Sequence, residues 1–200
     1  MSSKTVTAAP SSTASEILDV AEALIQTRGY SAFSYQDISD ALGIRKASIH
    51  YHFRSKAELA AAVVDRYAAR FSAALAGIAA NPRKSSLAML DQYMAPYFEF
   101  SKSPDKVCLC GALAGEMMAL PGAVRTRVEA FFEEHQQWLA RILQRGVERG
   151  EFVLSSRPAR MARMIFGALQ GALLVKRTTG DASQLADVAA ALKAQLRPAR

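Results

Sequence analysis

Cysteine, histidine and tryptophan are scarce in this 200-residue sequence, which holds two, three and one of them respectively. Cys108 and Cys110 are two positions apart, and on a helix two such side chains point to nearly opposite sides. We therefore expect neither a mutual disulfide nor a disulfide framework, and the thiols suit a reducing compartment. No spaced cluster of metal ligands and no phosphate-binding loop is evident, so we expect no metal and no cofactor.

Long hydrophobic runs are also missing from the sequence. The apolar stretches carry charges every few residues, and none reaches the length that a membrane span requires. The N-terminus lacks a charged region followed by an apolar run, so we expect no signal peptide. Together these absences predict a cytoplasmic protein without a membrane partner.

Proline is infrequent, with 7 residues, and most prolines stand between long stretches of helical periodicity. Half of the residues are hydrophobic (50%), and alanine and leucine dominate them. This composition favours an all-α protein, and the length allows one or two domains.

Positive charge is concentrated in one short segment. The net charge is +7 and the pI is about 9.6, a balance that favours acidic partners, with nucleic acid first. From Glu16 to Asp40 the sequence has five acidic residues and one basic residue. From Gly43 to Lys56 it has four basic residues and no acidic one. The alternative for such a segment is an ordinary solvated surface.

The first 80 residues predict a disordered tail and four helices. Residues 1–12 are rich in Ser, Thr and Ala and suit a disordered tail. Ser15 is expected to cap the first helix, which Gly29 ends. Ser34 and Asp37 resemble a capping box for a second helix that ends at Gly43. A third helix is expected from Lys46 to Phe53, with Phe53 in the core. This layout is a helix-turn-helix.

Ser55 and Glu58 form a capping-box pattern that opens a long fourth helix, ending near Asn81-Pro82. We expect a DNA-binding domain with its connecting helix over 13–80 and a second helical domain over 81–200, giving about nine helices in all. Pro96 predicts a kink in the fifth helix. The five later helices are expected at Ser85 to Lys102, Leu109 to Leu120, Pro121 to Arg149, Pro158 to Thr178 and Ala182 to Leu196.

Many positions between Phe33 and Leu59 agree with a known pattern at fixed spacing. The matching residues are Asp37-Ile38, Leu42-Gly43-Ile44 and the run from His50 through Tyr51, His52, Phe53, Arg54, Ser55, Lys56, Ala57 and Glu58 to Leu59. Over about residues 15 to 65 the sequence resembles the TetR family of bacterial transcriptional regulators. It departs from that pattern at Arg45, where a small capping residue is usual, at Ala47, where Gly is common, and at His50, where Tyr is common.

The helix-turn-helix pattern predicts which side chains contact DNA. Such proteins read base edges with the N-terminal residues of the second helix of the motif. Arg45 suits a guanine edge through paired hydrogen bonds, and Ala47 suits a thymine methyl group. Lys46 and Ser48 stand at the same N-terminus and are also expected at base edges. The candidates expected on the phosphate backbone are Tyr35, Gln36, His50, Tyr51, His52 and Lys56.

The resemblance implies a homodimer and a ligand pocket in the second domain. The last two helices would form the dimer face, where small residues (Ala162, Gly167, Ala168, Gly171 and Ala172) permit close approach; the alternative is an ordinary core helix. An unknown small-molecule effector would lie among Tyr93, Tyr97, Cys108, Met117, Phe131, His135, Trp138 and Gln170, although most of these suit a core equally well.

Cys108 stands at the expected start of a helix, where a thiol ionises more readily. Because some regulators of the resembled family sense oxidants or electrophiles through cysteine, Cys108 is a candidate sensor; the alternative is a buried structural thiol.

The sequence as a whole predicts a repressor and not an enzyme. It would bind a palindromic operator as a homodimer and leave it when a small-molecule or electrophile inducer binds. Three alternatives remain open at this point: an enzyme with Cys108 as nucleophile and His135 as base, a helical protein that binds DNA without sequence preference, and an activator or ligand-dependent co-repressor.

Overall fold

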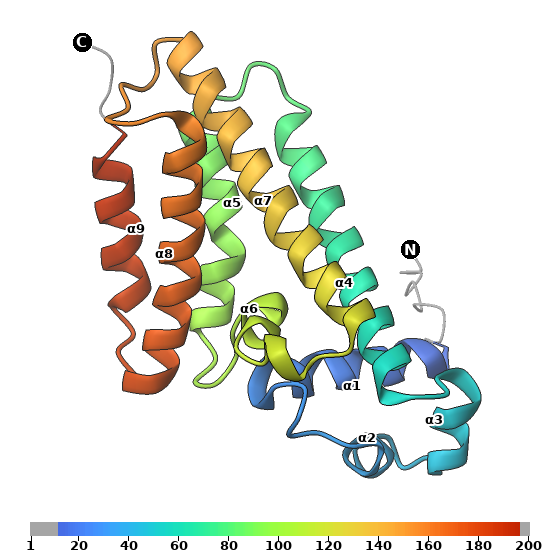
Figure 1. Ribbon diagram of the computed structural model, residues 1–200. Helices are drawn as coiled ribbons and strands as arrows, with labels where there is room; N and C mark the ends of the chain where they lie inside the picture. The colour runs from blue at the N-terminus through green and yellow to red at the C-terminus, as the bar shows by residue number, and fades with distance from the viewer. Residues whose placement is uncertain (1–11, 197–200) are drawn as a thin grey trace, which may run out of the picture.

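The computed structural model describes residues 12–196, which form nine α-helices, one short 3₁₀ helix and no β-strand (Figure 1). This confirms the all-α prediction. The elements are α1 (Thr13–Arg28), α2 (Tyr35–Leu42), α3 (Lys46–His52), α4 (Lys56–Ala79), α5 (Ser86–Ser101), α6 (Leu109–Ala114), η1 (Met117–Ala119), α7 (Gly122–Glu148), α8 (Pro158–Thr179) and α9 (Gln184–Ala194).

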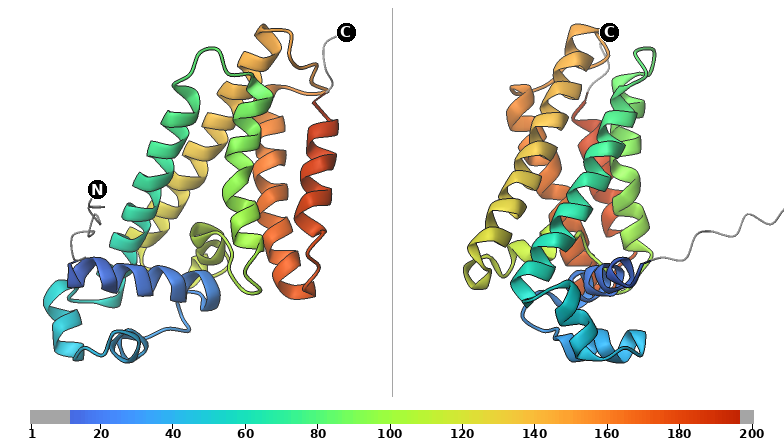
Figure 2. Two further views of the ribbon diagram at one scale, coloured as in Figure 1. Left: turned by 180° about the vertical axis from the view of Figure 1, so that it is seen from behind. Right: turned by 90° about the vertical axis from the view of Figure 1, so that its right-hand side faces the viewer.

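Helices α1, α2 and α3 form a small unit, here called the three-helix end, and α5 to α9 form a larger bundle (Figures 1 and 2). The long α4 joins the two. Helix α7 packs against α4, α5, α6 and α8, while α9 lies on α8 and α5. Short α6 contacts α1, so the bundle rests directly on the three-helix end. Between residues 12 and 196 no helix combines the length and apolar character that a membrane span needs.

The three-helix end is built on α1. Ile17, Ala21 and Ile25 of α1 are fully buried at helical spacing. Glu22 ties α1 to α4, since its carboxylate lies 2.6 Å from Arg70 Nη2 and 3.4 Å from Arg66 Nη2.

Helix α1 begins at Thr13 with Ser12 as its cap, because Ser12 Oγ accepts a hydrogen bond from the Ser15 amide at 3.3 Å. The prediction that Ser15 caps this helix was therefore wrong. The predicted disordered tail lies outside the described residues except for this cap.

The bundle departs from the sequence-based prediction at α6. One helix was expected from Leu109 to Leu120, but α6 ends at Ala114, and a turn at Gly115 and Glu116 separates it from η1. The reason is tertiary: at this turn the Glu116 carboxylate accepts hydrogen bonds from the Tyr30 and Ser31 amides of the three-helix end. Helix α9 is also shorter than expected, ending at Ala194.

Candidate nucleic-acid interface and ligand cavity

Helix α2 begins with a complete capping box. Ser34 Oγ accepts from the Gln36 amide at 3.2 Å, and Asp37 Oδ2 accepts from the Ser34 amide at 2.8 Å. Bonds of this kind satisfy amides that the first turn leaves unpaired, and each cap stabilises a helix by about 1 kcal/mol. The box fixes where α2 starts, and thereby the direction from which it crosses α3.

The turn between α2 and α3 depends on Gly43, whose φ of 65° lies in the left-handed region that favours glycine. After it, the Ile44 amide donates to Ser39 O at 3.2 Å, while Ser39 Oγ donates to Ile44 O. These bonds close the turn, so α3 leaves it in a fixed direction.

Helix α3 has one buried side and a broad exposed side. Ile49 is fully buried and Phe53, just after the helix, is 8% exposed, which confirms Phe53 as core. Because residues four apart lie nearly above one another, the other positions form three rows. These rows are Lys46 with His50, Ala47 with Tyr51, and Ser48 with His52. Tyr51 is 85% exposed, so it is not part of the core.

Arg45 is the N-cap residue of α3, and its side chain makes no capping hydrogen bond. Its backbone is extended, with φ −74° and ψ 146°, and the residue is exposed. The helix thus starts without a side-chain cap, and no side-chain partner holds the guanidinium within residues 12–196, so it can bind an external partner. Gln36 on α2 is exposed too, and it shares a surface hollow with Lys46 and His50.

Two of the expected phosphate contacts are engaged inside the protein. The Tyr35 hydroxyl donates to Phe53 O at 2.9 Å, and burial raises the pKa of Tyr35 to about 12. Lys56 Nζ donates to the carbonyls of Phe33 and Ser31 and lies 4.6 Å from the centre of the Tyr30 ring. Both side chains therefore hold the motif together, whereas most side chains on the outer rows of α3 are exposed.

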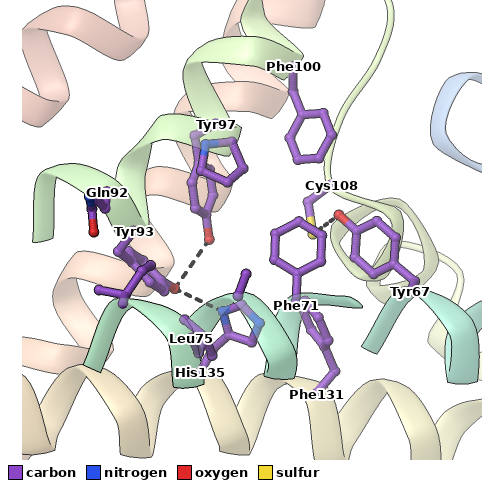
Figure 3. Close-up of a pocket in the computed structure, with 13 residues that line it drawn as sticks. Tyr67, Phe71, Leu75, Gln92, Tyr93, Tyr97, Phe100, Cys108, Phe131 and His135 are labelled. Atoms are coloured by element: carbon purple, nitrogen blue, oxygen red, sulfur yellow. Dashed lines mark hydrogen bonds between the residues drawn. The ribbon is translucent and has the colours of Figure 1, made fainter. Parts of the chain in front are cut away.

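A second candidate site is a cavity between α4, α5 and α7, with free space of about 50 Å³ (Figure 3). That space suffices for a few water molecules, since each requires roughly 10–15 Å³. None of the lining residues is Asp, Glu, Lys or Arg. They are Tyr67, Phe71, Ala74, Leu75, Ile78, Gln92, Tyr93, Pro96, Tyr97, Phe100, Cys108, Phe131 and His135.

A chain of hydrogen bonds runs along one wall of this cavity. Gln170 Nε2 donates to the Tyr97 hydroxyl at 3.3 Å, the two tyrosine hydroxyls are 3.5 Å apart, and the Tyr93 hydroxyl is 3.1 Å from His135 Nδ1. His135 is 3% exposed, and its other nitrogen, Nε2, has no hydrogen-bond partner among residues 12–196. Burial lowers the pKa of His135 to about 4, so the ring is neutral at pH 7.

Both thiols are buried, and neither forms a disulfide. Cys108 lines the cavity and is 3.6 Å from the Tyr67 hydroxyl, whereas Cys110 is fully buried and burial raises the pKa of its thiol. The hydrogen-bond partners of Cys108 and His135 within residues 12–196 are tyrosines, not each other. The pair therefore lacks the contact that a cysteine nucleophile and its base require.

The expected ligand residues divide into three groups. Tyr93, Tyr97, Cys108, Phe131 and His135 line the cavity, as expected. Trp138 and Gln170 do not line the cavity but contact residues that do. The rings of Trp138 and Tyr93 are stacked with their centroids 5.3 Å apart, and Gln170 donates a hydrogen bond to the Tyr97 hydroxyl. Met117 lies in η1, away from the cavity. The aromatic residues that were missed are Tyr67 and Phe71. The available signal was the spacing of Tyr67, Phe71, Leu75 and Ile78 on one face of α4.

Glu116 links the two parts of the protein and was not foreseen. Its Oε1 accepts from the Tyr30 amide at 2.7 Å and its Oε2 from the Ser31 amide at 2.8 Å. Burial alone would raise the pKa of this carboxyl, but the bonds from Ser31 and Tyr30 and the charge of Lys56 outweigh it and lower the pKa. A Cβ on Gly29, whose φ is 88°, would lie 2.0 Å from Glu116 Oε1, so this contact requires glycine.

Helix α8 has an apolar side that no part of residues 12–196 covers. Met164, Leu174 and Val175 are 43%, 38% and 44% exposed, and Gly167 and Gly171 have open space beyond them. By contrast, two of the small residues expected on the dimer face, Ala162 and Ala172, are buried in the bundle core, together with Met161, Ile165, Leu169 and Leu173 of the same helix. The figures place α8 and α9 side by side at an edge of the bundle (Figures 1 and 2).

Comparison with known proteins agrees with this geometry. The family described as "Bacterial regulatory proteins, tetR family" matches residues 17–63, and "Tetracyclin repressor-like, C-terminal domain" matches residues 86–192. An uncharacterized HTH-type transcriptional regulator of Lactococcus lactis is 30% identical over 86% of this chain and 87% of its own length. The HTH-type transcriptional repressor DhaR of Mycobacterium sp. is 26% identical over 74% and 73%.

Among solved structures, a TetR transcriptional regulator from Legionella pneumophila superimposes with a TM-score of 0.85 at 33% identity. The match covers 94% of this chain and 99% of that one.

Proposed function

We propose that this chain, which belongs to the TetR family of bacterial transcriptional regulators, is a repressor that binds a palindromic operator as a homodimer and leaves it when an inducer binds. The observation that carries the proposal is α3: a short helix with a broad exposed face and, at its N-terminus, an exposed arginine whose side chain has no partner among the described residues. A free guanidinium at this position matches the paired acceptors of guanine in the major groove.

The three exposed rows of α3 assign different tasks to its side chains. Ala47 and Tyr51 point directly away from the buried row, so they face the floor of the groove when α3 enters it. Lys46 and His50 on one flank, together with Gln36 of α2, suit one phosphate backbone. Ser48 and His52 suit the other flank. Tyr35 and Lys56 support this surface from inside and contact DNA less directly.

Dimerisation would use the uncovered side of α8 together with α9. Glycine in a helix interior costs about 1 kcal/mol relative to alanine, and no neighbour within residues 12–196 requires it at Gly167 or Gly171. A second copy of the same helix would explain both glycines, because it can approach closely at these positions. Two copies present two α3 helices, which matches a palindrome with half-sites about one helical turn apart.

The inducer would bind in the cavity between α4, α5 and α7. The free space of about 50 Å³ is smaller than an ordinary metabolite, so binding requires the walls to move apart. A ligand that fits only the wider form has the differential affinity that a switch needs. Cys108 lines this cavity and is also the N-cap residue of α6. A small electrophile held in the cavity would lie beside its sulfur.

Two contacts connect α6 to the DNA-binding helices. α6 contacts α1, and Glu116, two residues after α6, holds the Tyr30 and Ser31 amides that precede α2. A displacement at Cys108 would therefore shift the segment from which α2 and α3 start. In a dimer, this changes the spacing of the two recognition helices.

The DNA-binding part is tested by fluorescence anisotropy with the DNA that flanks the protein's own coding region. Arg45→Ala removes a base contact worth about 1–3 kcal/mol, so we expect at least about a fivefold loss in affinity. Arg141→Ala, at an exposed position on α7, is the matched control and should bind normally. Equal losses in both variants would contradict the assignment of α3, and equal affinity for random DNA would favour binding without sequence preference.

A further inference from the structure

Within the described residues, His135 Nε2 is a buried polar atom without a hydrogen-bond partner, and His135 lines the cavity. His135 is 3% exposed, and in the part of the chain that the structure describes only Nδ1 of its two ring nitrogens has a hydrogen-bond partner, the Tyr93 hydroxyl. Figure 3 shows the imidazole between Tyr93 and the aromatic rings of Phe71 and Phe131. An unpaired buried polar group costs about 1–3 kcal/mol, so a partner supplied from outside would be favourable.

The direction of the hydrogen-bond chain decides what Nε2 offers. Gln170 Nε2 can only donate, so the Tyr97 oxygen accepts from it. If Tyr97 then donates to Tyr93, and Tyr93 donates to His135 Nδ1, every hydroxyl hydrogen of the chain has an acceptor. The ring proton is then on Nε2. In the reverse direction the Tyr97 hydroxyl hydrogen has no acceptor, which adds a second unsatisfied group at a buried site.

The residues that line the cavity restrict the charge of a ligand that accepts a hydrogen bond from His135 Nε2–H. No Asp, Glu, Lys or Arg is among the lining residues, and most of the wall is aromatic or aliphatic. An ion placed here would lose its hydration without a counter-charge, which costs far more than a hydrogen bond returns. Burial keeps His135 itself uncharged at neutral pH, since it lowers the pKa to about 4.

We infer that the cavity selects neutral, largely apolar molecules that carry one hydrogen-bond acceptor, such as a ketone or aldehyde oxygen, which accepts from His135 Nε2–H. This inference rests on the proposed inducer site and narrows its ligand. The same chain reaches Gln170 on α8, so the bound acceptor is connected through Tyr93 and Tyr97 to the helix of the proposed dimer face.

The test uses three probes of similar size that do not react with thiols: cyclohexanone, methylenecyclohexane, which has CH₂ in place of the oxygen, and the anion cyclohexanecarboxylate. Trp138, the one tryptophan of the sequence, stacks on Tyr93, so its fluorescence reports binding to the full-length protein. We expect cyclohexanone to bind about tenfold more tightly than methylenecyclohexane, as one hydrogen bond to a buried donor provides, and the anion to bind most weakly.

Two variants test whether the preference for cyclohexanone over methylenecyclohexane depends on His135. His135→Phe keeps a ring but removes the donor, so the two neutral probes should bind equally. Tyr93→Phe keeps His135 but removes the hydroxyl that fixes its tautomer, so the preference should shrink. Equal binding of both neutral probes to the wild type, tighter binding of the anion, or no binding of cyclohexanone would overturn the inference.

A measurement without ligand tests the direction of the chain. In ¹⁵N-histidine NMR spectra of the wild type, assigned with His135→Phe, the His135 cross-peaks should show the neutral Nε2–H tautomer at pH 7. The Nδ1–H tautomer would overturn the inference. The proposed inducer site fails in a different way: cyclohexanone would bind with the expected preference but leave the affinity for DNA unchanged at saturation.

Discussion

Replacing Glu116 by Gln tests the contact between the bundle and the DNA-binding helices. The carboxylate accepts from two amides, whereas the amide of Gln has one acceptor oxygen and would turn its NH₂ toward the other donor. The variant therefore loses at least one hydrogen bond to a charged acceptor. Such a bond contributes about 1.5–3 kcal/mol, and partial exposure reduces the expected loss to about 1–2 kcal/mol.

Amide hydrogen exchange measures this loss where it occurs. The Tyr30 amide is half-buried, and a loss of about 1–2 kcal/mol should make it exchange roughly 5- to 30-fold faster in Glu116→Gln. Glu129→Gln is the matched control, since Glu129 is exposed on α7 and the change of charge is the same. Unchanged exchange at Tyr30, or an equal change in the control, would refute the role of Glu116.

The pH dependence gives a second check on the same carboxylate. The pKa of Glu116 is lowered in the folded protein relative to an ordinary Glu near 4.3. Its contribution is therefore fully present above that value and is lost as the pH falls through the lower folded pKa. The difference in unfolding free energy between the wild type and Glu116→Gln should be constant from pH 6 to 8 and shrink below about pH 4.

Three further predictions concern other parts of the protein. The folded pKa of His135, about 4, is below the unfolded value of 6.5. Protonation of His135 should therefore lower the free energy of unfolding by up to about 3 kcal/mol as the pH falls from 6.5 to 4. Denaturant titrations should show a smaller pH effect in His135→Phe. Gly171→Gln should weaken the proposed dimer in analytical ultracentrifugation, whereas Gly77→Gln, at an open helical site on α4, should not. Cys108→Ser should abolish release from DNA by an electrophile without changing DNA binding; an unchanged response would leave Cys108 as a structural thiol.

The DNA-binding part was largely predictable because its determinants are local in sequence. Ser34, Asp37 and Gly43 act on residues within a few positions, so their spacing alone indicates the capping box and the turn. Arg45 was recognisable as an unusual cap, and its side chain makes no capping bond in the structure. Even here a local rule misled in detail: Ser55 caps α4, but Glu58 accepts from the Arg54 amide and not from Ser55.

The remaining features depend on contacts between distant segments. Glu116 bonds amides 86 and 85 residues away, and nothing near it in sequence indicates those partners. The same contact explains why α6 stops short of Leu120. On α8, helical periodicity identified an apolar helix but not which side is core, because both sides are apolar. Packing against α7 and α9 decides that Leu169 is buried and Gly171 borders open space.

The most direct test of the proposed function is selection of bound fragments from a pool of random double-stranded DNA by the purified protein. We expect the enriched sequences to share an inverted repeat with half-sites about one helical turn apart, and Arg45→Ala to lose preference at one position of each half-site. A pool that remains random after repeated selection, or a single site without symmetry, would contradict a homodimer that reads a palindrome through α3.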